Sequence, residues 1–172
     1  MTQYLVYGRD RAGSLDVKVR LTEEHWTFMD GYAAELIARG PTLTPDRSGP
    51  TGSLHIVDLP SADALHRFVY EEPYYLGGAF GSVEVYRFEN LTGRTMWEFA
   101  TPVAGYERFL VLAKDAARPL SSDHLIVYGN LYDGARHVGR AGLVEAPSAD
   151  AARALLESAD AEVHAWEFGG RR

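Results

Sequence analysis

The sequence predicts an α+β fold built from two tandem βαββαβ units. Two observations indicate this: one block of sequence occurs twice, and similar elements surround both copies. Residues 52–64 read GSLHIVDLPSADA, and residues 139–151 read GRAGLVEAPSADA, at a constant separation of 87 residues. A repeat that includes both a strand pattern and a helix start indicates duplication of a whole structural unit.

Each copy of the block reads as a strand followed by a helix. Apolar residues alternate with others in the first part, which is typical of a half-buried strand. A Pro-Ser pair then ends the strand, and its serine can cap the next helix, expected at 62–70 and at 149–158. Closing strands are expected at 83–88 and 163–168. These lie 80 residues apart, so the second copy lacks seven residues before its closing strand.

The segments upstream of the block correspond in order. In the first half, a strand at 4–8 leads to a helix at about Thr22–Arg39, which stops at Gly40-Pro41. In the second half, a strand at Met96–Ala100 leads to a helix at about Val103–Ala117. Each half therefore has the ferredoxin-like order.

A long strand at His124–Tyr132, followed by an Asp-Gly turn, completes the second unit. The expected domains are residues 1–90 and 95–172, joined by a short linker. Helices cover only one face of such a sheet, so the two sheets are expected to cover each other as an intramolecular pseudo-dimer. Whether this unit stays monomeric or forms a further homodimer is left open by the sequence.

Composition excludes several classes of function. The chain has 172 residues, 46% of them hydrophobic, with a net charge of −7 and no cysteine. Such a charge disfavours nucleic-acid binding, and no apolar run approaches the roughly 20 residues of a membrane span. Without cysteine there is no disulfide and no thiolate nucleophile. We expect a soluble, cytoplasmic protein that acts on a small molecule.

The first half also carries a set of short motifs from Tyr4 to Phe88. In chain order they are Arg11-Ala12-Gly13-Ser14, a helix with His25, Gly40-Pro41, Gly52, Glu71-Glu72-Pro73-Tyr74 and Gly77-Gly78. In this order they resemble the YCII-related family of the dimeric α/β-barrel superfamily. The resemblance implies that the two ferredoxin-like units pack as an intramolecular dimeric α/β barrel.

The resemblance also implies a catalytic pair. The family's helix histidine matches His25, and the aspartate of its Asp-Pro-Tyr or Asp-Pro-Phe motif matches Glu72, which is one methylene longer. In the second half, Tyr106 is expected near the position of His25, and the missing residues are those of the Glu-Pro-Tyr turn. One site per chain is therefore expected, in the first half.

Several residues near this pair are candidates for substrate binding. Lys18 and Arg20 could hold an anionic or enolate oxygen, although a surface role is the more common one for such residues. Tyr74 and Tyr75 could line a pocket or serve only for packing. His55 would line the cavity if its face of the strand points into the barrel. Alternatively, His25 is an exposed residue on a helix and Glu72 is a solvated acidic residue in a loop, and neither has a catalytic role.

The sequence contains no motif for several other kinds of site. His124, His137 and His164 show no zinc-ligand spacing. The Gly77–Gly81 stretch lacks the lysine and the strand–helix context of a phosphate loop, and there is no Gly-x-Ser-x-Gly motif. No metal and no cofactor are expected. What remains is acid–base chemistry on a bound small molecule.

The sequence therefore favours a cofactor-free enzyme that uses a His–carboxylate pair for proton transfer. The expected reaction is that of a lyase, of the dehydratase or dehydrochlorinase type, or of an isomerase, on a cyclic or aromatic metabolite. His25 would be the base or acid, Glu72 its orienting partner, and Lys18 or Arg20 the oxyanion holder. One alternative is a cofactor-independent monooxygenase or cyclase of aromatic polyketides, in secondary metabolism. The other is a binding protein without catalysis.

Overall fold

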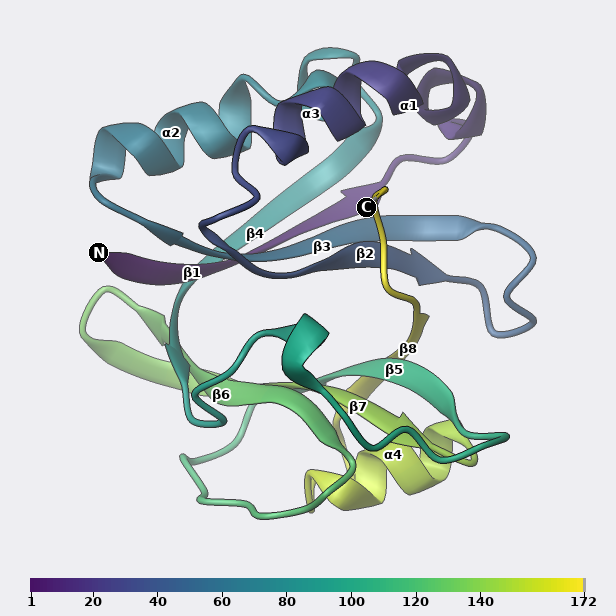
Figure 1. Cartoon of the computed structure of the whole chain (residues 1–172), viewed down its shortest axis with the longest axis vertical. Coiled ribbons are helices and arrows are strands. Elements are labelled where there is room, and N and C mark those ends of the chain that lie inside the picture. The colour runs from purple at the N-terminus through teal and green to yellow at the C-terminus, as the bar shows by residue number, and fades with distance from the viewer. Residues whose placement is uncertain (172) are drawn as a thin grey trace.

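The computed structural model describes residues 1–171, in which eight antiparallel strands form one closed barrel with helices on its outside (Figure 1). The strand order around the barrel is β1-β3-β2-β8-β5-β7-β6-β4. The strands are β1 Thr2–Asp10, β2 Leu36–Leu43, β3 Pro50–Leu59, β4 Phe80–Asn90, β5 Glu107–Ala113, β6 Leu125–Asp133, β7 Arg136–Ala146 and β8 Glu162–Trp166. The helices are α1 Leu15–Asp30, α2 Ala62–Tyr70, α3 Pro73–Leu76, the 3-10 helix η1 Met96–Glu98 and α4 Ala149–Leu155.

The predicted fold class is confirmed. Each half contributes four neighbouring strands, β4-β1-β3-β2 and β6-β7-β5-β8, which is the ferredoxin-like order in both cases. Helices α1, α2 and α3 cover the outer face of the first sheet, and α4 covers that of the second (Figure 1). The two sheets face each other and are joined at the β2–β8 and β4–β6 seams.

The second half lacks a counterpart of α1, so the predicted helix at Val103–Ala117 is wrong. Ile56 in β3 pairs with Leu5, and Leu143 in β7 pairs with Leu110. Ile56 and Leu143 are 87 residues apart, whereas Leu5 and Leu110 are 105 apart. The second half is thus 18 residues shorter between these strands, close to the 16 residues of α1.

The segment before β5 also differs from the prediction. Met96–Ala100 was expected as a strand but contains η1, whose start is fixed by a capping box between Thr95 and Glu98. Tyr106 lies directly before β5 and not on a helix, so it does not occupy the position of His25. The strand β5 is buried between β7 and β8, and such a continuous apolar run cannot be told from a helix by periodicity.

The predicted helix at Thr22–Arg39 is also corrected. Helix α1 ends at Asp30, where the N–H of Gly31 donates to the carbonyl of Phe28 and the N–H of Tyr32 to that of Met29. The chain then turns and enters β2, which pairs with β3. Tertiary pairing here overrides local helix propensity, because the buried Leu36–Ala38 run completes the sheet. Gly40 and Pro41, predicted to end a helix, lie inside the strand.

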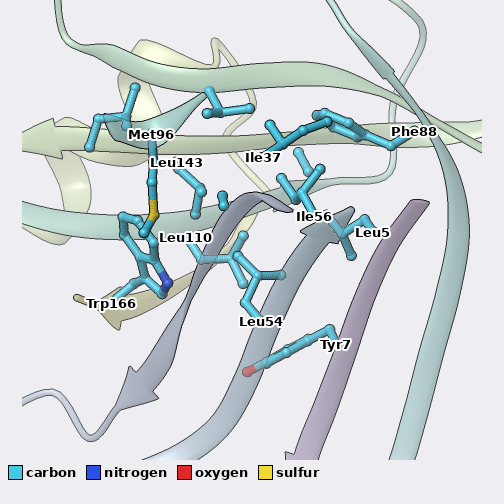
Figure 2. Close-up of a cluster of buried hydrophobic side chains, with 14 of the residues drawn as sticks. Leu5, Tyr7, Ile37, Leu54, Ile56, Phe88, Met96, Leu110, Leu143 and Trp166 are labelled. Carbon is cyan, nitrogen blue, oxygen red and sulfur yellow. The ribbon is translucent and has the colours of Figure 1, made fainter. Parts of the chain in front are cut away.

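Large apolar side chains from both halves fill the barrel interior (Figure 2). Leu54 and Ile56 of β3 meet Leu110, Leu143 and Trp166 of the second half there. Separate clusters lie between each sheet and its own helices. The middle of the barrel is therefore a packed core that requires both halves.

An ion-pair network near one end of the barrel links β1 to β8. Arg9 donates through Nε to Glu84 Oε2 at 2.5 Å, and through Nη1 and Nη2 to both oxygens of Glu162, with Nη2 to Oε2 at 3.1 Å. His164 Nε2 also contacts Glu162 Oε1 at 2.7 Å. The hydrogen bond from Arg9 is the main cause that lowers the pKa of Glu162 to about 2.

This network makes the stability depend on acid pH. Because the folded pKa of Glu162 lies below its ordinary value of 4.5, its contribution is fully present above pH about 4.5. It is expected to be lost progressively as the pH falls toward 2. Urea unfolding between pH 7 and pH 2 should show a smaller acid loss in Glu162→Gln than in the wild type. An identical acid profile in the two proteins would contradict this account.

Within residues 1–171, none of the helices is both long enough and apolar enough to cross a membrane.

Candidate functional site

The short helix α3 positions Glu72 against α1. Glu72 is the N-cap of α3, and its two carboxylate oxygens accept the backbone N–H groups of Tyr74 and Tyr75, both at 3.0 Å. Pro73 at the first helical position suits this start. Both carboxylate oxygens are thereby fixed in one orientation, and the side chain is only 3% exposed.

His25 contacts this carboxylate from the middle of α1. Its Nδ1 is hydrogen-bonded to Glu72 Oε1, and the residue is 7% exposed. Glu72 Oε1 already accepts one backbone N–H, so a protonated Nδ1 that donates to it is the favourable arrangement. The neutral ring then keeps its lone pair on Nε2, the form required of a base.

The ring of Tyr74 stacks on His25 and holds it in place. Their ring centroids are 4.0 Å apart and the planes are inclined by only 9°. The Tyr74 hydroxyl donates to Thr22 Oγ1 at 3.5 Å, and burial raises the pKa of this phenol. Tyr74 is therefore a buried, neutral neighbour that restricts how the imidazole can turn.

A cavity of about 370 Å³ lies beside this pair, between α1 and the outer face of β2 and β3. Its size suits one small molecule. Of the predicted site residues, Lys18, His25, His55 and Tyr74 line it. Glu72 lies behind His25 and does not line it.

His55 faces the helix layer and not the barrel interior. Leu54 and Ile56, its neighbours in β3, point into the barrel, so His55 reaches the cavity from the opposite face. Its ring lies 5.7 Å from that of His25. Burial lowers the pKa of His55 well below its ordinary value, and the nearby His25, Arg39 and Lys18 lower it further. His55 is therefore neutral at physiological pH.

Lys18 is buried and already paired. Its Nζ donates to both carboxylate oxygens of Asp10 at 3.0 Å and to Ser53 Oγ at 3.2 Å. The pKa of Asp10 is raised by burial, which outweighs the effect of the lysine. The three contacts match the three donors of the ammonium group, so Lys18 is less free than expected to bind a substrate oxygen.

Two predicted residues lie outside the cavity. Arg20 is exposed on α1 and does not line it. The ring of Tyr75 is 38% exposed and packs against Tyr70, although its backbone N–H helps to hold Glu72. The structure therefore does not bring these two side chains to His25.

Sequence reasoning missed three further parts of the cavity wall. Ser53 lies two residues before His55 on the same face of β3, a spacing that could have revealed it. Arg39 lies in the segment predicted as helix. The tail segment Phe168–Gly170 follows the last strand and carries no pattern that would place it beside α1.

A second cavity, of about 600 Å³, lies at the end of the barrel beside the Arg9 network. It is lined by several acidic groups, among them Glu84 and Glu162, and both of these are paired with Arg9. His25 and Glu72 do not line it. Among residues 1–171, no group of three or more His, Cys, Asp and Glu side chains is placed to hold a metal ion.

The family model of the YCII-related domain matches residues 2–89, just over half of the chain, including the helices that carry His25 and Glu72. The chain belongs to the YCII-related family. A comparison with curated proteins gave no match.

Two solved structures are similar to this YCII-related protein. One is the 5-chloro-2-hydroxyhydroquinone dehydrochlorinase of Burkholderia phenoliruptrix, in complex with 2,5-dihydroxybenzoquinone. It is 30% identical, covers 54% of this chain and 98% of its own, and has a TM-score of 0.49. The other is a "putative monooxygenase" from Lactobacillus acidophilus. It is 6% identical, covers 99% of this chain and 98% of its own, and has a TM-score of 0.49.

Proposed function

We propose that this protein is a small-molecule enzyme in which His25 transfers a proton and Glu72 orients it. The reaction is that of a lyase, of the dehydratase or dehydrochlorinase type, or of an isomerase, on a cyclic or aromatic metabolite. One observation carries the proposal: Nδ1 of His25 is held by a buried carboxylate, which leaves Nε2 for a ligand in the cavity. Glu72 then stabilises the imidazolium that forms when Nε2 takes a proton.

The chemistry begins with removal of an acidic proton, from a phenol or from a carbon beside a carbonyl group. Nε2 of His25 takes this proton, and the electron pair of the broken bond moves onto the substrate oxygen. In a chlorinated phenol, His25 returns the proton to the carbon that bears chlorine, and chloride then leaves with its bonding electrons as a second hydroxyl group loses its proton. In a β-hydroxy ketone, the hydroxyl takes the proton from His25 and leaves as water. Return of the proton to a different carbon gives an isomerase instead.

Positive charge in the cavity supports the oxyanion step. Lys18 lies two turns before His25 on the buried face of α1, beside Ser53. Its field favours negative charge on a bound substrate, although Asp10 balances part of it. The neutral His55 can donate one N–H to the same oxygen. These groups are fixed before the substrate arrives, so little reorganisation is required in the transition state.

The test is chloride release from 5-chloro-2-hydroxyhydroquinone, followed by ion chromatography under nitrogen and under air. A hydroxylated ring with a leaving group suits the proposed step. We expect protein-dependent release at the same rate in both atmospheres. Release that occurs only in air, with oxygen consumed, would favour the monooxygenase instead. Binding without any product would favour a non-catalytic binding protein.

A further inference from the structure

Arg39 is a buried cation in the cavity that the proposed reaction does not use. It lies in β2, is 5% exposed, and lines the cavity together with His25 and His55. Its Nη1 donates to Asp30 Oδ1 at 3.2 Å, but its Nη2 is buried without any hydrogen-bond partner. A buried guanidinium donor without an acceptor is costly, and an unpaired donor in a ligand cavity indicates that the ligand brings the acceptor.

The C-terminal tail covers this guanidinium group. After β8, the tail Phe168–Arg171 leaves the second sheet and rises beside β2 and β3 to α1 (Figure 1). The N–H of Gly169 donates to the backbone carbonyl of Arg39 at 3.0 Å. An ideal Cβ at Gly170 would lie only 2.5 Å from both Nε and Nη2 of Arg39, and Gly170 has a φ of +82°. Only glycine allows the tail this close approach.

The far end of the tail is held by a surface contact. Arg171 donates to Asp30 Oδ2 at 2.9 Å and to Thr27 Oγ1 at 3.1 Å, and it also pairs with Glu23. Arg171, Glu23 and Thr27 are exposed, and exposed ion pairs contribute little to stability. The end of the tail, Gly170-Arg171, can therefore be released at small cost while Phe168 stays packed against the barrel core, and its release would uncover Nη2 of Arg39.

The balance of charge selects an anion as the partner of Arg39. The carboxylate of Asp10 faces Lys18, but Asp30 is shared between Arg39 and Arg171. Of Lys18 and Arg39, it is therefore Arg39 whose positive charge is less fully balanced by a carboxylate and whose Nη2 has no hydrogen-bond acceptor. A planar carboxylate suits a guanidinium group because two parallel hydrogen bonds can form.

We propose that Arg39 binds a carboxylate of the ligand, and that the end of the tail, Gly170-Arg171, moves aside to admit it. The substrate class is then a cyclic or aromatic carboxylate with a single ring, which a cavity of about 370 Å³ accommodates. This inference rests on the proposed function, because it assigns a substrate class to the cavity beside His25.

The test compares two probes that differ by one carboxylate, 2,5-dihydroxybenzoate and hydroquinone, by calorimetric titration. The wild type should bind the carboxylate at least about tenfold more tightly, as expected for charge-assisted hydrogen bonds. Arg39→Met should reduce this preference to within about twofold, since the anion loses its partner. Arg67→Met, which removes an exposed arginine on α2, is the matched control and should keep the full preference.

The titration separates this inference from the proposed function. His25→Gln should lower kcat by about 10²–10⁴-fold but keep the preference for the carboxylate. Equal affinities for the two probes in the wild type, no binding of the carboxylate at millimolar concentration, or an undiminished preference in Arg39→Met would each overturn the role of Arg39. If Arg39→Met does not fold, Arg39→Gln keeps a donor for Asp30 without the charge, and an unchanged preference in that variant would overturn the role equally.

Stopped-flow binding tests the movement of the tail. Arg171→Met removes the contacts with Asp30 and Thr27 but leaves the cavity wall unchanged. The association rate constant of 2,5-dihydroxybenzoate should rise about two- to fivefold, the range expected from losing exposed ion pairs. An unchanged or lower association rate would contradict the proposed movement of the tail. The role of Arg39 would then be decided by the titration alone.

Discussion

His25→Gln is expected to lower kcat for chloride release by about 10²–10⁴-fold, the usual contribution of a positioned acid or base. Glutamine fills much of the same volume and can still donate to Glu72, but it cannot take up a proton near neutral pH. The substrate still fits the cavity, so KM should change less than kcat. The measurement is steady-state release of chloride from 5-chloro-2-hydroxyhydroquinone under nitrogen.

His66→Gln provides the matched control for this loss. His66 lies exposed on α2, its ring lies 4.8 Å from that of Tyr70, and it does not line the cavity. Its variant should keep the wild-type kcat. If His25→Gln keeps the wild-type rate, or if both variants lose the same amount, the assignment of the proton transfer to His25 is wrong.

Trp166→Ala is expected to lower the free energy of unfolding by about 3–5 kcal/mol, the range for removal of a large buried aromatic side chain. Trp166 is fully buried in the barrel interior and lies on β8, opposite Thr42 of β2. Its loss leaves a cavity at the seam that joins the two halves. Because both halves border this cavity, neither sheet can fill it without moving the other.

Urea unfolding followed by circular dichroism measures this effect. Tyr70→Ala removes a large aromatic that is 40% exposed on α2, and should cost about 1 kcal/mol or less. A loss of under about 1 kcal/mol for Trp166→Ala would mean that the two halves are stabilised separately and not through a shared core.

The repeated elements could be predicted from the sequence because their signals are local. The predicted helix at 62–70 has the same bounds as α2, and its start is fixed by Ser61, whose Oγ accepts the N–H of Ala64 at 3.1 Å. Ser148 caps α4 through Ala151 in the same way. A proline, a serine cap and an alternating strand occur within ten residues, so nothing distant decides the structure there.

The strands β2 and β5 could not be predicted in the same way. β5 is a short apolar run that pairs with β7 and β8, whereas β2 contains Arg, Gly and Pro and pairs with the neighbouring β3 and, at one end, with the distant β8. Local propensity favoured a helix through Arg39, and this error hid the cation that faces the cavity. Pairing with other strands, and not intrinsic helix propensity, decides these two segments.

The candidate site was only partly accessible to sequence analysis. His25 and Glu72 are 47 residues apart, and a family resemblance paired them before the fold brought their side chains into contact. No pattern in the sequence indicated that Asp10 would form an ion pair with Lys18 or that the C-terminal tail would cover Arg39. Both facts depend on how buried charges are balanced, which only the packed structure shows.

The central claim, that His25 and Glu72 act as one proton-transfer unit, is tested most directly by a double-mutant cycle. We would measure kcat for chloride release in the wild type, His25→Gln, Glu72→Gln and the double variant. Without the histidine, Glu72 has nothing to orient, so the double variant should be no slower than His25→Gln within about threefold. Fully additive losses from the two substitutions would show that the residues act independently and would contradict the account.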